Sequence, residues 1–161
     1  MVLGVVFVSI AGCSTSPANV AGTYTVSLAN DANGCMFQNW DGVTTTGVPL
    51  TISQTGTSVT AVVGGTAAAV FDVLFGSHVL VGNVSGSHID VVIHGTNQTT
   101  PAGTSCTLSL DAHASVDLVG DALANGTITY TYVTNRDSTC PIYTQTCTSV
   151  QLFNGTRPPS R

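Results

Sequence analysis

The sequence predicts an all-β protein, a small antiparallel meander barrel of eight to ten strands, with a two-sheet β-sandwich as the alternative. Composition is the first reason: the 161 residues include 25 Thr but no Lys and no Glu, so strand formers abound and good helix formers are scarce. Short alternating stretches separated by Gly- and Asn-rich turns are the second. No connection is long enough for a parallel crossover, so successive hairpins are expected, and closure would hide their edges.

The individual strands follow from this alternation. The stretch GTYTVSLA places Tyr24, Val26 and Leu28 on one face. In the long stretch SCTLSLDAHASVDL at 105–118, apolar and polar residues alternate throughout. This is typical of a strand with one face packed on the core and one face exposed to solvent. The remaining strands are expected at 48–54, 57–63, 67–75, 77–84, 87–95, 127–133 and 148–153.

The charge pattern excludes several classes of function. The net charge is −5, all eight acidic residues are Asp, and the three Arg form no cluster. This argues against nucleic acid as a partner and against electrostatic docking on anionic lipid. The chain has no Gly-x-Ser-x-Gly elbow, no Glu for a carboxylate pair and no Gly-rich phosphate loop, so we expect neither an enzyme nor a cofactor.

The amino-terminal stretch carries a motif. An apolar run from Val5 to Ile10 is too short to cross a bilayer, which needs about 20 apolar residues. The sequence Ile10-Ala11-Gly12-Cys13 resembles the lipobox of bacterial lipoproteins. That resemblance implies cleavage before Cys13, attachment of fatty acyl chains such as palmitate, and an anchor in the outer membrane of the cell envelope, facing the periplasm or the surface. Such signals usually open with Lys or Arg, so we expect the true start to lie upstream.

These motifs divide the chain into segments. We expect a signal peptide at 1–12, the lipidated cysteine with a short tether at 13–21, one β domain at 22–155 and a carboxy-terminal tail at 156–161.

The remaining cysteines fit an exported, oxidising environment. Setting Cys13 aside leaves an even number, Cys35, Cys106, Cys140 and Cys147, which predicts two disulfides. Three pairings are possible. We favour Cys140–Cys147, which closes the short stretch CPIYTQTC, with Cys35–Cys106 by remainder. Structural zinc is the rival interpretation, and the lack of a Cys-x-x-Cys pair disfavours it.

One constellation suggests a metal. In SHIDVVIH, the residues His88, Asp90 and His94 share a strand face, and the next strand carries Asp111 and His113 on its polar face. In one register His88 faces His113, and in another Asp90 faces His113. Either mixture of imidazole and carboxylate suits zinc or copper. The simpler interpretation, which we favour, is the solvent-facing side of a sheet.

Aromatic residues in turn-rich segments suggest a second kind of site. Phe37, Trp40 and Tyr143 lie where exposed aromatics can form a binding rim. A lone Trp between strands more often plugs the end of a barrel as part of its core.

The Gly-punctuated hairpins, the strand count and Gly22-Thr23-Tyr24 resemble the calycin group of lipocalin-like and avidin-like barrels. In lipocalins the first strand carries Gly-x-Trp, and an Arg late in the chain covers the Trp. Here Tyr24 stands in the place of the Trp, and Arg157 is the candidate counterpart. The resemblance implies an architecture and carries no ligand with it.

Together these features predict a non-enzymatic, lipid-anchored binding or structural module of the cell envelope. A small-ligand carrier of lipocalin-like type and a protein-binding inhibitor or adhesin are the alternatives, with a metal-binding protein as the third.

Overall fold

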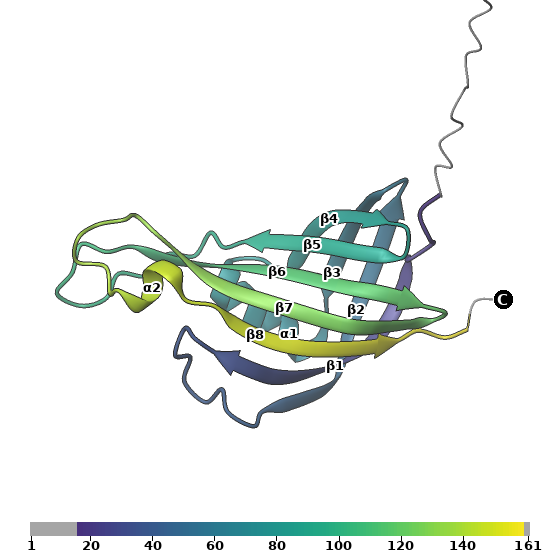
Figure 1. The fold of residues 1–161 in the computed structure, drawn as a ribbon, viewed down its shortest axis with the longest axis horizontal. Coiled ribbons are helices and arrows are strands. Elements are labelled where there is room, and N and C mark those ends of the chain that lie inside the picture. Colours follow the sequence, from purple (N-terminus) through teal and green to yellow (C-terminus); the bar gives the residue numbers. More distant parts are fainter. Residues whose placement is uncertain (1–15, 160–161) are drawn as a thin grey trace, which may run out of the picture.

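The protein is a closed barrel of eight antiparallel strands, in which each strand pairs with the next along the chain and the last pairs with the first (Figure 1). The all-β barrel predicted from the sequence is therefore confirmed. The structure, a computed structural model, describes residues 16–159, and the predicted signal peptide and Cys13 lie outside them. Its strands are β1 (Gly22–Asn33), β2 (Thr44–Thr55), β3 (Ser58–Val63), β4 (Val79–Ser85), β5 (His88–His94), β6 (Leu108–Val119), β7 (Ala122–Thr134) and β8 (Ser149–Thr156).

The core fills the inside of the barrel, as the period-two pattern predicts. Along β6, Leu108, Leu110, Ala112, Ala114 and Val116 are buried, while the residues between them lie on the outer face. The other strands contribute inward-facing Val, Ile and Leu in the same alternation. Closure leaves neither β1 nor β8 as a free edge, so the backbone groups of both strands are paired.

The two ends of the barrel differ. One end, here called the hairpin end, carries the tight turns 56–57, 86–87 and 120–121 that join neighbouring strands. The opposite end, here called the mouth, carries four longer connections, which are residues 34–43, 64–78, 95–107 and 135–148. Ordered loops on a rigid scaffold are the usual place for a binding site, so the mouth is where a site is expected.

One predicted strand is wrong. Residues 67–75 belong to a helix, α1 (Gly65–Phe75), which lies at the mouth between β3 and β4. The helix ends at Gly76, whose left-handed φ of 80° lets its N–H donate to the carbonyl of Asp72. A short second helix, α2 (Tyr143–Thr146), precedes β8. In the described part of the chain, neither helix has the length and apolar character needed to cross a bilayer.

The hairpin end is sealed by the residues that the calycin resemblance singled out. Tyr24 is fully buried, and its hydroxyl donates to the carbonyl of Val20 at 2.8 Å. The guanidinium of Arg157 covers the Tyr24 ring, with Cζ 5.5 Å from the ring centroid. Arg157 also donates to the carbonyl of Ala21 at 2.6 Å and to the carboxylate of Asp121 at 3.1 Å. These contacts tie the segment before β1 to the segment after β8.

The four cysteines form two disulfides, as predicted, but the favoured pairing is wrong. The bridges are Cys35–Cys147 and Cys106–Cys140. Barrel closure explains the first: β1 and β8 are neighbours, so the residues just after β1 meet those just before β8. The second joins the connection just before β6 to the connection after β7, and these two strands also pair. Both disulfides therefore fasten the loops of the mouth.

Candidate functional site

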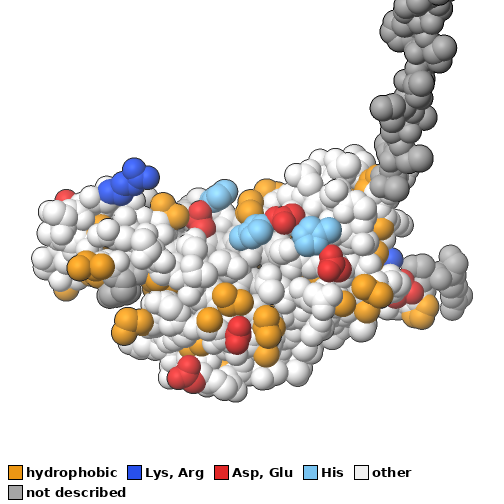
Figure 2. All heavy atoms as spheres, viewed as in Figure 1, with side chains coloured by type: hydrophobic (Ala, Val, Ile, Leu, Met, Phe, Trp, Pro, Cys, Tyr) orange, Lys and Arg blue, Asp and Glu red, His pale blue; other side chains and the backbone are white. Residues whose placement is uncertain are grey.

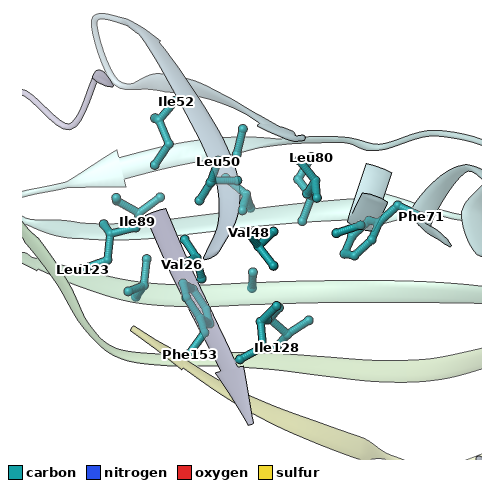
Figure 3. A pocket seen from close by; sticks show the side chains of 17 residues that line it. Val26, Val48, Leu50, Ile52, Phe71, Leu80, Ile89, Leu123, Ile128 and Phe153 are labelled. Atoms are coloured by element: carbon teal, nitrogen blue, oxygen red, sulfur yellow. The ribbon is translucent and has the colours of Figure 1, made fainter. Parts of the chain in front are cut away.

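The barrel contains an apolar cavity of about 70 Å³. All seventeen residues that line it are apolar, among them Val48, Ile52, Leu80, Val116 and Phe153. Figure 3 shows the labelled side chains pointing into this space from several strands, with Phe71 at one end of the group. A space of this kind offers no partner to water and is filled favourably only by an apolar group.

A larger pocket of about 560 Å³, here called the mouth pocket, opens next to it. Its volume lies within the roughly 300–1,000 Å³ of small-molecule sites. Val43 of the 34–43 connection and Val70 and Leu74 of α1 form part of its wall and are 43–55% exposed, so the pocket reaches the surface. Apolar side chains left exposed beside a pocket are typical of a ligand-binding groove.

The two spaces meet at three side chains. Leu28 of β1 and Ala67 and Phe71 of α1 line both the inner cavity and the mouth pocket. Helix α1 thus stands between the interior of the barrel and solvent. Its fully buried Phe75 packs near Phe71, with ring centroids 5.2 Å apart, and anchors the helix to the core.

The end of α1 is held by the connection that follows β5. The side-chain amide of Asn97 donates to the carbonyls of Asp72 and Val73, both at 2.9 Å, and the N–H of Thr96 donates to the carbonyl of Phe75 at 2.8 Å. The bonds to Val73 and Phe75 satisfy carbonyls that the end of a helix would otherwise leave unpaired, while the Asp72 carbonyl also accepts from the N–H of Gly76. They fix the helix as one wall of the mouth pocket.

A chain of hydrogen bonds runs along the wall that β1, β7 and β8 contribute to the mouth pocket. The hydroxyl of Tyr130 donates to Gln151 Oε1 at 2.5 Å, and Gln151 Nε2 donates to Asn30 Oδ1 at 2.5 Å. Asn30 Nδ2 then donates to the carbonyl of Trp40 at 2.6 Å. Burial raises the pKa of Tyr130 far above its ordinary value, so its hydroxyl stays protonated and remains a donor. The wall is polar, ordered and uncharged.

Two of the three aromatic residues predicted as a binding rim lie at the mouth pocket. Phe37 and Trp40 both line the mouth pocket, with ring centroids 5.4 Å apart, and each also contacts the ring of Tyr130. Trp40 is only 9% exposed and belongs to the core, so it both plugs the barrel and forms pocket wall. Tyr143 begins α2, and its side chain lies outside the described part of the structure.

The histidines and aspartates predicted as metal ligands lie on the outer face of β5 and β6. Figure 2 shows His and Asp side chains gathered along this face. The Nε2 atom of His113 contacts Asp90 Oδ1, and His94 Nδ1 lies 2.7 Å from Asp111 Oδ2. His88 Nε2 is 3.7 Å from the Asp90 carboxylate. These imidazole and carboxylate groups form His–Asp contacts that are open to solvent.

The register between β5 and β6 differs from both registers that the sequence suggested. His88 pairs with Asp117, and Asp90 pairs with Ser115. Within residues 16–159, no three or more His, Cys, Asp or Glu side chains are grouped so that they could hold a metal ion.

One His–Asp contact on this outer face predicts a pH dependence of stability. The hydrogen bond from His88, at 2.7 Å, is the main cause that lowers the pKa of Asp117 below its ordinary value. A carboxyl whose folded-state pKa is depressed stabilises the fold above its unfolded pKa of about 3.9 and loses that contribution as the pH falls through the folded value. We therefore expect the melting temperature to fall as the pH is lowered below about 5 and on through the folded-state pKa of Asp117. His88→Ala and Asp117→Asn should each reduce that drop, measured by circular dichroism; an unchanged drop in both variants would contradict the assignment.

The sequence reasoning missed Asn30, Gln151 and the role of α1. A signal was available for the first two. Asn30 is in phase with the inward-facing Tyr24, Val26 and Leu28, and Gln151 is in phase with the buried Phe153. A polar residue at an inward position of a strand needs a hydrogen-bond partner inside the barrel, and it therefore marks a candidate site.

No protein-family model matches this chain, and comparisons with curated proteins and with solved structures give no match either. The site is therefore argued from its own geometry: an eight-stranded barrel, an apolar interior and a mixed polar and apolar pocket at one end.

Proposed function

We propose that this chain is a non-enzymatic binding protein that holds a small, largely apolar molecule at the barrel mouth. The observation that carries the proposal is the adjacency of two spaces: an apolar cavity inside the barrel and a pocket of about 560 Å³ that share Leu28, Ala67 and Phe71 as lining residues. The mouth pocket has room for the body of a ligand, and the inner cavity accepts only a narrow apolar end.

The cell envelope is the location that we propose, with attachment through acyl chains on Cys13. The course of the described chain is compatible with this. Residues 16–21 run along the hairpin end, where the N–H of Ala18 donates to the carbonyl of Gly86 at 2.7 Å and the N–H of Val20 donates to Gln54 Oε1 at 2.8 Å. A tether leaving from that end would keep the mouth free for ligand.

The test is a titration with N-phenyl-1-naphthylamine, an uncharged apolar probe whose fluorescence rises in apolar surroundings. We expect saturable binding to the wild-type protein. Ala67→Phe should weaken binding about tenfold or more, because the added ring occupies the junction of the two spaces. The matched control is Ala69→Phe, the same substitution at an exposed position of the same helix that lines neither space. Equal loss in both variants, or no saturable binding to the wild type, would refute the proposal.

A further inference from the structure

The mouth pocket is polar without being charged. Seven of its lining side chains carry hydrogen-bonding groups, and none of them is charged. One is the indole of Trp40, whose N–H donates to the carbonyl of Asp31 at 3.1 Å, and the others are amides or hydroxyls: Asn30, Gln38, Thr45, Thr66, Tyr130 and Gln151. Neither the mouth pocket nor the inner cavity is lined by an Asp, Arg or His. A charged head group placed there would lose its water without gaining a counter-charge, which is costly.

The charges outside the pocket act against an anion in particular. Asp31, Asp41 and Asp72 are exposed on the segments that surround the mouth, and the chain carries a net charge of −5. Asp72 lies 2.8 Å from Nδ1 of His78, whereas Asp31 and Asp41 form no ion pair among the described residues. Of the two arginines in the described residues, Arg157 seals the hairpin end. Arg136 lies on the 135–148 connection at the mouth, where it lines a separate pocket with Tyr132 and Gln145 and not the mouth pocket. A carboxylate or phosphate approaching the mouth therefore meets a repulsive field.

The hydrogen-bonded chain on the pocket wall retains the capacity to bind an oxygen-bearing group. Each side-chain amide has two N–H donors, and the chain uses one from Gln151 and one from Asn30. The Tyr130 hydroxyl donates to Gln151 and keeps lone pairs that can accept. The mutual bonds hold these groups in place before a ligand arrives, which favours recognition.

We infer that the mouth pocket selects an uncharged amphiphile, an apolar chain with a hydroxyl- or carbonyl-bearing head group, through Asn30, Gln151 and Tyr130. This inference rests on the proposed function and specifies its ligand class. The apolar chain lies towards the inner cavity, past Leu28 and Phe71, and the head group meets the polar wall. Free fatty acids and phospholipid-type anions are excluded as preferred ligands.

The experiment compares three probes with the same lauryl chain and different heads: monolauroylglycerol, laurate and lauryltrimethylammonium, each below its micellar concentration. Trp40 reports binding directly, because it is the one tryptophan of the sequence and forms part of the pocket wall. We expect monolauroylglycerol to change its fluorescence saturably and to bind about tenfold tighter, or more, than either charged probe.

A charge introduced into the wall tests the mechanism. Gln151→Glu keeps an acceptor for the Tyr130 hydroxyl but places a carboxylate in the pocket, so monolauroylglycerol should bind several-fold more weakly and lauryltrimethylammonium more tightly. Gln145→Glu, an exposed position of α2 outside the mouth pocket, is the control with the same change of charge. Its ranking of the probes should match that of the wild type.

The outcomes separate the two claims. Laurate or lauryltrimethylammonium binding to the wild type as tightly as monolauroylglycerol would overturn the selection of an uncharged head while leaving the proposed binding function intact. No saturable response to any lauryl probe, together with no binding of N-phenyl-1-naphthylamine, would remove the proposed function and this inference with it. The wild-type comparison decides the matter even if Gln151→Glu fails to fold.

Discussion

Replacing Cys35 and Cys147 together by Ala will lower the free energy of unfolding by about 4–5 kcal/mol on the chain-entropy estimate. The bridge closes a loop that spans a sequence separation of 112, so its loss raises the conformational entropy of the unfolded chain by a large amount. The Cys106–Cys140 bridge closes a loop with a sequence separation of only 34. Replacing both of its cysteines by Ala should therefore lower the free energy of unfolding by less, about 3.5–4 kcal/mol on the same estimate. Guanidinium unfolding followed by circular dichroism measures both; a reversed order would contradict the loop-length argument.

The pairing itself has a sharp test. The sequence has no Lys, and Arg136 lies between Cys106 and Cys140 in the chain, so trypsin cuts between these two cysteines. With the bridges Cys35–Cys147 and Cys106–Cys140, both disulfides span that cut, and the fragments stay together until they are reduced. With Cys140–Cys147 and Cys35–Cys106, they separate without reductant.

Trypsin alone does not distinguish the third pairing, Cys35–Cys140 with Cys106–Cys147, because it also spans the cut. Chymotrypsin resolves it, since cleavage after Tyr143 places Cys140 and Cys147 on different peptides. The masses of the linked peptides then identify each bridge.

Tyr24→Ala is expected to destabilise the barrel by about 3–5 kcal/mol, the cost of deleting a large buried aromatic side chain. The Tyr24 ring is fully buried, its hydroxyl donates to Val20, and Arg157 covers its face. Removing the ring leaves a cavity at the hairpin end and takes away the surface on which Arg157 stacks. The measurement is the free energy of unfolding by chemical denaturation.

Two companions make this prediction specific. Tyr24→Phe removes only the hydrogen bond to Val20 and should cost about 1 kcal/mol. Thr23→Ala, at the exposed neighbouring position, should change stability by less than about 0.5 kcal/mol. Tyr24→Phe should also leave probe binding unchanged, because Tyr24 lines neither the cavity nor the mouth pocket. A loss below about 1 kcal/mol for Tyr24→Ala would contradict the sealing role.

Local pattern was enough for most of the strands. In β6 every second residue from Leu108 to Val116 is buried, as the alternation predicts, because a strand turns successive side chains to opposite faces. The same rule fails for residues 67–75, a short apolar run interrupted only by Asp72. Such a run fits a buried strand or a packed helix equally well. Here it forms a helix at the mouth, whose side chains Ala67, Phe71 and Phe75 pack against the barrel core.

The sequence by itself determined the all-β class, the inward faces of the strands and the presence of two disulfides. Barrel closure decided the rest. It pairs β1 with β8 and so places Asn30 opposite Gln151, 121 positions along the chain, and Cys35 beside Cys147. The physical reason is that alternation depends on neighbours within a strand, whereas the pocket and the bridges depend on which strands meet when the sheet closes.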